Sequence, residues 1–338
     1  MFSVKTRSHL ISTLLTGSAI IASGLLLSPV ATNSQGSTTI KIDGSSTVFP
    51  ISEVAAEEFQ KSKAGAIKVT VGVSGTGGGF KKFCSGQTDI SNASRPISTK
   101  EIEACRAKGI RYIELPIAYD AITVAVHSEN SWANSLSVEQ LKKIWEPGAQ
   151  GKITNWNQIN SRFPNQPLKL FGPGRSSGTF DYFTEAVNGK SKESRTDFTA
   201  SEDDNVLVNG ISKDKGGLGY FGMAYYEANK NKLKAIKVGG VEPSVATVKS
   251  GKYTPLARPL FIYVNATTAS KPEVKEFVSF YLKNAAQFAT QTRYVSLPDA
   301  AYTTAIKHFD NKRTGSVFGG KEAIGLTIEE LITRDAQD

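Results

Sequence analysis

Residues 168–180 (LKLFGPGRSSGTF) combine several groups that bind anions. A short apolar strand ends in a Gly-Pro-Gly turn, and the turn leads into a predicted helix with Phe180 on its apolar face. The first N–H groups of a helix are unpaired and carry positive partial charge, so they favour an anion. Arg175 adds a permanently charged planar guanidinium, and Ser177 and Thr179 add hydroxyl groups. The stretch predicts a bound oxyanion, although the same residues are also typical of ordinary helix caps.

Two more stretches have the same order of strand, donor-rich turn and helix. Residues 43–50 (DGSSTVFP) follow the alternating Ile40 and Ile42, and residues 74–80 (SGTGGGF) follow alternating apolar positions over 67–73. Apolar residues at helical spacing come after each turn. Three such turns predict an α/β architecture in which a ligand binds beyond the ends of the strands.

The composition is that of a globular protein. The chain has 338 residues, of which 39% are hydrophobic and 21% charged, enough for a sizeable core and two lobes. The net charge is +9, but there is no long basic run and no zinc-knuckle or RNP-like pattern. We therefore expect no nucleic-acid partner, and we interpret the charge as a solvated surface that attracts anions. Three histidines in the whole chain give no reason to expect a metal or another cofactor.

The N-terminus predicts a secretory signal over residues 1–33. Lys5 and Arg7 are followed by an apolar stretch without charge that runs to Val30. We expect cleavage near 31–34 and a periplasmic mature protein. An uncleaved membrane anchor is the alternative, because the apolar span is long for a signal.

The two cysteines, Cys84 and Cys105, both lie in the exported part of the chain. An oxidising compartment favours one structural disulfide between them, and two free buried thiols are the alternative.

Residues 174–178 (GRSSG) match the G-x-S-x-G turn of serine hydrolases, which makes such an enzyme a rival interpretation. Its nucleophile would be Ser176, and it would need a later histidine, for which only His308 is available. The context of the motif is incomplete, so we expect no catalytic residues.

Five motifs in order resemble those of the PstS family, the secreted phosphate-binding proteins of Pst ABC transporters, in its cyanobacterial PstS/SphX branch. They are DGSSTVFP at 43–50, SGTGGGF at 74–80, DISNASRP at 89–96, GPGRSSGTF at 172–180 and GLGYF at 217–221. The resemblance covers nearly the whole mature chain.

The resemblance implies a type II periplasmic-binding-protein fold with two α/β lobes, a two-crossing hinge and a central ligand cleft. The crossings fall near Val126 and Pro259, so lobe I comprises 37–126 plus 259–338 and lobe II comprises 127–258. The implied function is capture of inorganic phosphate by a monomer and delivery to a membrane permease. Another tetrahedral oxyanion, sulfate or arsenate, is the alternative ligand.

The resemblance also implies the ligand contacts and supports the disulfide between Cys84 and Cys105. Lobe I supplies three groups of donors and lobe II a fourth; together they are Ser46, Thr47, the Val48 amide, Ser74, Thr76, Ser94, Arg95, Arg175, Ser177, Gly178 and Thr179.

Two positions depart from the pattern of some relatives. Ser94 stands where those relatives have an aspartate that accepts the proton of hydrogen phosphate, which leaves Asp89, Asp120 and Asp181 as unranked candidates for that role. Pro173 stands where they have the phosphate-binding arginine, so the assignment of Arg175 as the clamp is an inference.

Overall fold

The computed structural model describes residues 38–337 and has an α/β fold built on a mixed sheet of nine strands. The strands are ordered β2-β1-β3-β11-β4-β8-β6-β7, with β9 also paired to β4, and β5 and β10 form a separate ribbon. The strand bounds are β1 Thr38–Gly44, β2 Ile67–Val73, β3 Ile90–Ala93, β4 Tyr112–His127, β5 Ser135–Leu136, β6 Lys169–Pro173, β7 Thr199–Ser201, β8 Gly217–Gly222, β9 Leu233–Ala235, β10 Lys237–Val238 and β11 Ala257–Asn265.

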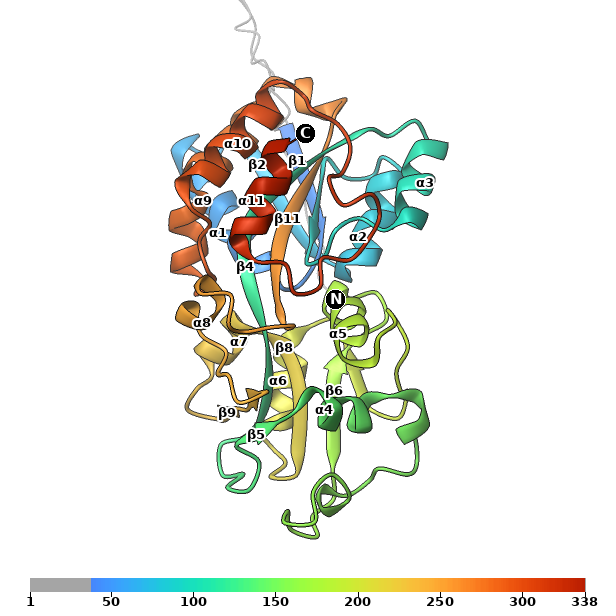
Figure 1. Ribbon diagram of the computed structural model, residues 1–338. Helices are drawn as coiled ribbons and strands as arrows, with labels where there is room; N and C mark the ends of the chain where they lie inside the picture. The colour runs from blue at the N-terminus through green and yellow to red at the C-terminus, as the bar shows by residue number, and fades with distance from the viewer. Residues whose placement is uncertain (1–37, 338) are drawn as a thin grey trace, which may run out of the picture. The chain divides into compact units, whose positions relative to one another are not determined.

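The long strand β4 joins the two halves of this sheet (Figure 1). It pairs antiparallel with β11 from Tyr112 to Ala121 and then antiparallel with β8 from Ile122 to Val126. We call β2, β1, β3 and β11 the first half of the sheet, and β8, β6, β7 and β9 the second half. Both halves contain parallel strand pairs, which expose the C-terminal ends of their strands to the turns singled out in the sequence.

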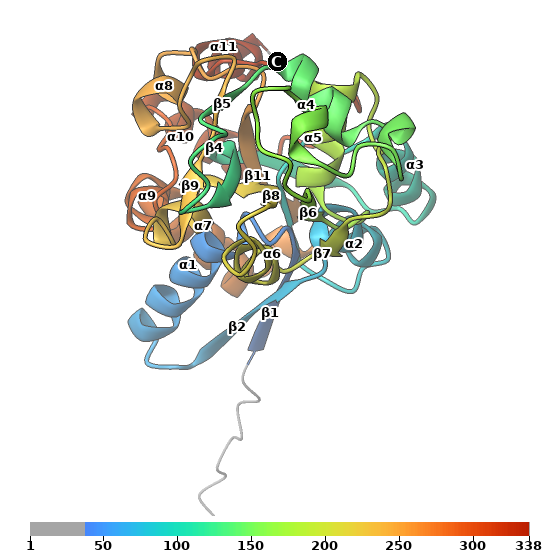
Figure 2. The same ribbon diagram turned by 90° about the horizontal axis from the view of Figure 1, so that it is seen from below.

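Helices cover both faces of the first half of the sheet. Figures 1 and 2 show α1, α9 and α10 on one face and α2 and α3 on the other. The helix bounds are α1 Phe49–Ser62, α2 Gly75–Cys84, α3 Thr99–Ala107, α4 Val138–Trp145, α5 Gly178–Asn188, α6 Asp204–Ile211, α7 Met223–Ala228, α8 Val245–Lys249, α9 Pro272–Gln291, α10 Asp299–Asp310 and α11 Ile328–Gln337, with short 3₁₀ turns η1 Pro147–Ala149, η2 Trp156–Gln158 and η3 Thr268–Ser270.

All three predicted strand–turn–helix units are confirmed. Residues 45–48, residue 74 and residues 174–177 lie between β1 and α1, β2 and α2, and β6 and α5, respectively. Each helix buries the apolar face that the spacing predicts, for example Phe80 and Phe83 of α2. The predicted signal over 1–33 lies outside the described residues. Within 38–337, no helix combines the length and apolar character that a membrane span requires.

The predicted disulfide is present and joins Cys84, the last residue of α2, to Cys105 in α3. Both cysteines are buried, so the bond clamps the two helices that cover one face of the first half of the sheet. The polar segment of residues 89–96, which includes β3, lies between the two cysteines in the sequence.

Removing this cross-link is expected to destabilise the fold by about 3 kcal/mol, because it closes a loop with a sequence separation of 21. The measurement is urea unfolding of a Cys84→Ala, Cys105→Ala double variant beside the oxidised parent. The parent kept reduced should match the double variant in free energy of unfolding. Equal stability of all three forms would contradict a structural role for the bond.

Candidate functional site

Hydroxyl groups from both halves of the sheet meet where the three turns come together. The Thr47 Oγ1 atom, at the start of α1, lies 3.1 Å from the Thr179 Oγ1 atom, at the start of α5. Both side chains are buried. Since β1 precedes one of these helices and β6 the other, this contact connects the two halves of the sheet.

Arg258 of β11 lies beside these two hydroxyl groups and is 0% exposed. Its Nη2 atom donates to Thr179 Oγ1 at 2.9 Å and to Thr47 Oγ1 at 3.3 Å. Its Nε and Nη2 atoms also donate to Asp120 Oδ2, at 3.2 and 2.9 Å. Its Nη1 atom is buried and has no hydrogen-bond partner among the described residues. A buried charged N–H group normally has an acceptor, so this atom marks a position that an anion fits.

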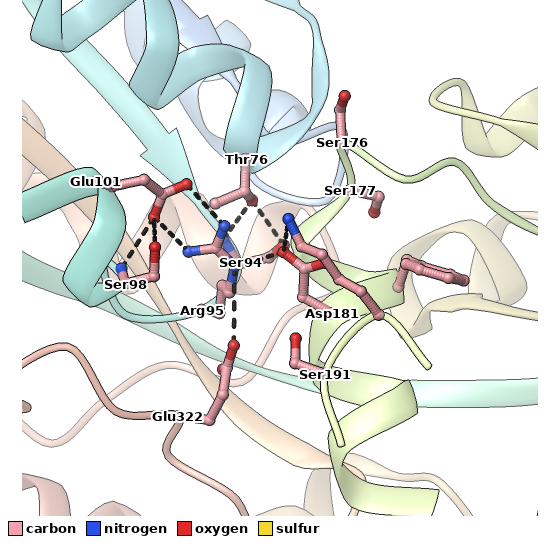
Figure 3. Close-up of polar contacts among 12 residues, drawn as sticks. Thr76, Ser94, Arg95, Ser98, Glu101, Ser176, Ser177, Asp181, Ser191 and Glu322 are labelled. Atoms are coloured by element: carbon pink, nitrogen blue, oxygen red, sulfur yellow. Dashed lines mark hydrogen bonds and ion pairs between the residues drawn. The ribbon is translucent and has the colours of Figure 1, made fainter. Parts of the chain in front are cut away.

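Thr76, Ser94 and Gly178 extend the same cluster of donors. The Thr76 and Ser94 hydroxyl oxygens lie 3.2 Å apart, and the Ser94 amide donates to Thr76 Oγ1 at 3.1 Å (Figure 3). A Cβ atom at position 178 would lie 2.5 Å from Thr76 Oγ1 and 2.7 Å from Ser94 Oγ. Only glycine therefore lets the N-terminus of α5 approach these hydroxyl groups. We call Thr47, Thr76, Ser94, Gly178, Thr179 and Arg258 the donor cup.

The two predicted arginines lie elsewhere. Arg175 is exposed on the turn between β6 and α5, whereas the hydroxyl groups are buried. Arg95 is buried, but its N–H groups donate to Glu101 and Asp181. Sequence reasoning missed Arg258; the available signal was a single arginine in an otherwise apolar strand, where a buried charge requires partners.

The remaining predicted contact residues have other partners. The Ser74 hydroxyl group donates to Asp43, and the Val48 amide donates to the Ser45 hydroxyl group at 3.4 Å. Ser177 is buried and accepts from the Thr179 amide at 3.1 Å, so it caps α5, as the alternative interpretation of this turn allowed. Ser46 is buried, and its hydroxyl group acts to lower the pKa of Asp204.

The three aspartates considered as proton acceptors all have other partners. Asp89 accepts from the Lys41 amide at 3.0 Å, Asp120 pairs with Arg258, and Asp181 pairs with Arg95. Asp120 Oδ1 also accepts from the Met223 amide at 3.0 Å.

Asp204, the first residue of α6, is a fourth buried carboxylate that sequence reasoning missed. It is 1% exposed, and its Oδ2 atom has no hydrogen-bond partner among the described residues. Burial raises the pKa of Asp204 to about 7 and the charge of Asp120 adds to the shift, while the Ser46 hydroxyl group and Arg258 act in the opposite direction. An acceptor without a partner thus lies within the electrostatic reach of the unpartnered Arg258 N–H group.

The residues of the hydrolase alternative lie on different elements. Ser176 is exposed on the turn between β6 and α5, where its amide donates to Glu202 Oε1 at 3.0 Å. His308 lies on α10 beside Arg313. Burial and the Arg313 charge lower the pKa of His308 to about 4.

Comparison with known proteins agrees with the fold and with the motifs. Residues 29–285 match the PBP superfamily domain. The chain is 54% identical over 319 residues to protein SphX of Synechococcus elongatus, with 93% of each chain covered. It is 39% identical to the phosphate-binding protein PstS of Staphylococcus saprophyticus, covering 87% of this chain and 93% of the relative.

A crystal structure from Clostridium perfringens, described as a phosphate ABC-transporter substrate-binding protein with bound phosphate, has a similar fold. The TM-score is 0.67 at 26% sequence identity, and the match covers 77% of this chain and 100% of the other. On the matched domain, the identity and the shared fold, the chain belongs to the SphX/PstS family of phosphate-binding proteins.

Proposed function

We propose that this chain binds inorganic phosphate in the donor cup, for import by a Pst-type ABC transporter. The observation that carries the proposal is the buried Nη1 atom of Arg258, which lacks a partner beside the hydroxyl groups of Thr47 and Thr179. A phosphate oxygen satisfies this N–H group, and the hydroxyl groups and the N-terminus of α5 bind the other oxygens.

The mechanism is capture by lobe closure and involves no covalent chemistry. Lobe I comprises 37–126 plus 259–338 and lobe II comprises 127–258, and the lobes move about β4 and β11. Donors from both lobes replace the hydration shell of the anion, and closure removes it from water. The chain carries out this capture in the periplasm after export by residues 1–33, and the closed form docks on a membrane permease.

Asp204 supplies the selectivity for phosphate. Hydrogen phosphate has both acceptor oxygens for Arg258 and a proton for the unpartnered Asp204 Oδ2 atom. Sulfate is fully ionised and has no proton to donate, so an ionised carboxylate at this position repels it. The relatives' aspartate at the position of Ser94 is therefore replaced here by a carboxylate from another element.

Calorimetric titration of the ligand-free chain with phosphate, and then with sulfate at equal ionic strength, tests the proposal. We expect tight one-to-one phosphate binding and sulfate binding weaker by about a hundredfold or more, which is about 2.7 kcal/mol. Equal affinity for both anions would contradict the proposed specificity for phosphate. Binding of neither anion would overturn the proposed function.

A further inference from the structure

Arg95 lies at the centre of a buried cluster of charges beside Ser94 and Thr76 of the donor cup (Figure 3). Its Nη1 and Nη2 atoms each donate to one oxygen of Glu101 at 2.8 Å, and its Nε atom donates to Asp181 Oδ2 at 2.8 Å. A third carboxylate, Glu322, lies 3.8 Å from Nε. Arg95 is 2% exposed and Asp181 is 1% exposed, so water screens this ion pair very little.

The two partners of the buried pair belong to different halves of the sheet. Arg95 follows β3 of the first half, and Glu101 lies in the next helix, α3. Asp181 lies in α5, the helix that follows β6 of the second half. The contact between Arg95 and Asp181 therefore exists only while the two halves are close together.

Each partner also has a second ion-pair partner on its own side. Glu101 binds the Arg95 guanidinium with both oxygens and is itself fixed by the Ser98 amide and hydroxyl group, at 2.9 and 2.8 Å. Asp181 has Lys192 on the segment after α5, at 3.7 Å from Oδ2. If the halves separate, neither charge loses its only counterion, so the pair can open reversibly.

The pair is coupled through the chain to the proposed phosphate ligands. Arg95 is the residue after Ser94, and Asp181 is the second residue after Thr179. The movement that brings Thr179 and Gly178 to the donor cup also brings Asp181 to Arg95. We propose that Arg95 and Asp181 form a closure latch, which stabilises the closed form and sets the rate of phosphate release. As a statement about phosphate release, this inference rests on the proposed function; as a statement about closure, it does not.

Asp181→Asn tests the latch, because the variant keeps the shape of the side chain and removes its charge. Phosphate release, followed by stopped-flow fluorescence, is expected to be about tenfold faster or more, with the association rate nearly unchanged. Glu322→Gln is the matched control, since it replaces another carboxyl group of the same cluster by an amide but removes no contact within 3.5 Å of Arg95. Because burial raises the pKa of Glu322 to about 8, both variants are compared with the parent above that pH, where Glu322 is charged. The release rate of Glu322→Gln should stay within about twofold of the parent rate.

A second measurement needs no ligand. Spin labels at Glu103→Cys in α3 and Asn209→Cys in α6 report the distance between the halves in the ligand-free chain. We expect longer distances in the Asp181→Asn background than in the parent or the Glu322→Gln background. Identical distance distributions, or an unchanged release rate in a parent that binds phosphate, would overturn the latch. A parent that binds no phosphate but opens on Asp181→Asn would overturn the proposed function and support the latch.

Discussion

Arg258→Met is expected to weaken phosphate binding by about a hundredfold or more, or about 2.7 kcal/mol. The variant removes the buried N–H group that lacks a partner and the donor that connects Thr47 and Thr179. Methionine keeps an unbranched apolar side chain of similar length, so the packing against β4 is preserved as far as a neutral residue allows. Calorimetric titration with phosphate measures the loss.

Two controls separate this loss of binding from a loss of folding. Arg258→Met leaves Asp120 as an unpaired buried carboxylate, so an Arg258→Met, Asp120→Asn double variant removes that destabilising charge, and its thermal unfolding shows whether the fold persists. Arg175→Ala removes the exposed arginine of the turn and should leave the affinity unchanged. If Arg175→Ala abolished binding while Arg258→Met did not, the anion would bind at the exposed turn. The assignment of the phosphate site to the donor cup would then be wrong.

The contrast between these two arginines shows what could be predicted from the sequence. The three strand–turn–helix units were predictable because periodicity, glycine and helix-cap residues act over a few neighbouring positions. The hydroxyl groups of Thr47, Thr76 and Thr179 lie in or directly beside such turns, whereas Ser94 was expected from the family resemblance. The structure pairs Thr47 with Thr179 and Thr76 with Ser94. The arginine beside them could not be chosen in this way. Arg258 is 79 positions from its partner Thr179, and only the pairing of β11 with β4 brings it to the site.

Burial of charge was the other feature that local patterns did not predict. The family resemblance implied that Arg95 binds the ligand, but three carboxylates from separate segments surround its guanidinium. Residues 202–204 form an acidic run at the start of α6. The first turn of α6 exposes Asp203, whose side chain caps the helix, and buries Asp204.

Asp204→Asn is expected to lower the discrimination between phosphate and sulfate by about tenfold or more. The amide can donate a hydrogen bond to sulfate and carries no charge, so both the acceptor for the phosphate proton and the repulsion of sulfate are lost. Titrations with each anion give the ratio of the two affinities. The matched control is Asp203→Asn, which makes the same change one residue earlier, at an exposed position where asparagine caps a helix as well as aspartate does.

The discrimination between phosphate and sulfate is also expected to depend on pH, in a direction that the pKa of Asp204 determines. Because burial, with Asp120, raises the pKa of Asp204 to about 7, the carboxyl group is charged above that pH and neutral below it. Only the charged form repels sulfate and accepts a proton, so the discrimination should increase as the pH rises through about 7 in the parent and in Asp203→Asn. In Asp204→Asn the dependence that comes from this carboxyl group should disappear. Parallel pH profiles for all three proteins, with the discrimination intact in Asp204→Asn, would assign the acceptor to another group, and Asp120 would be the next carboxylate to test because it already contacts Arg258.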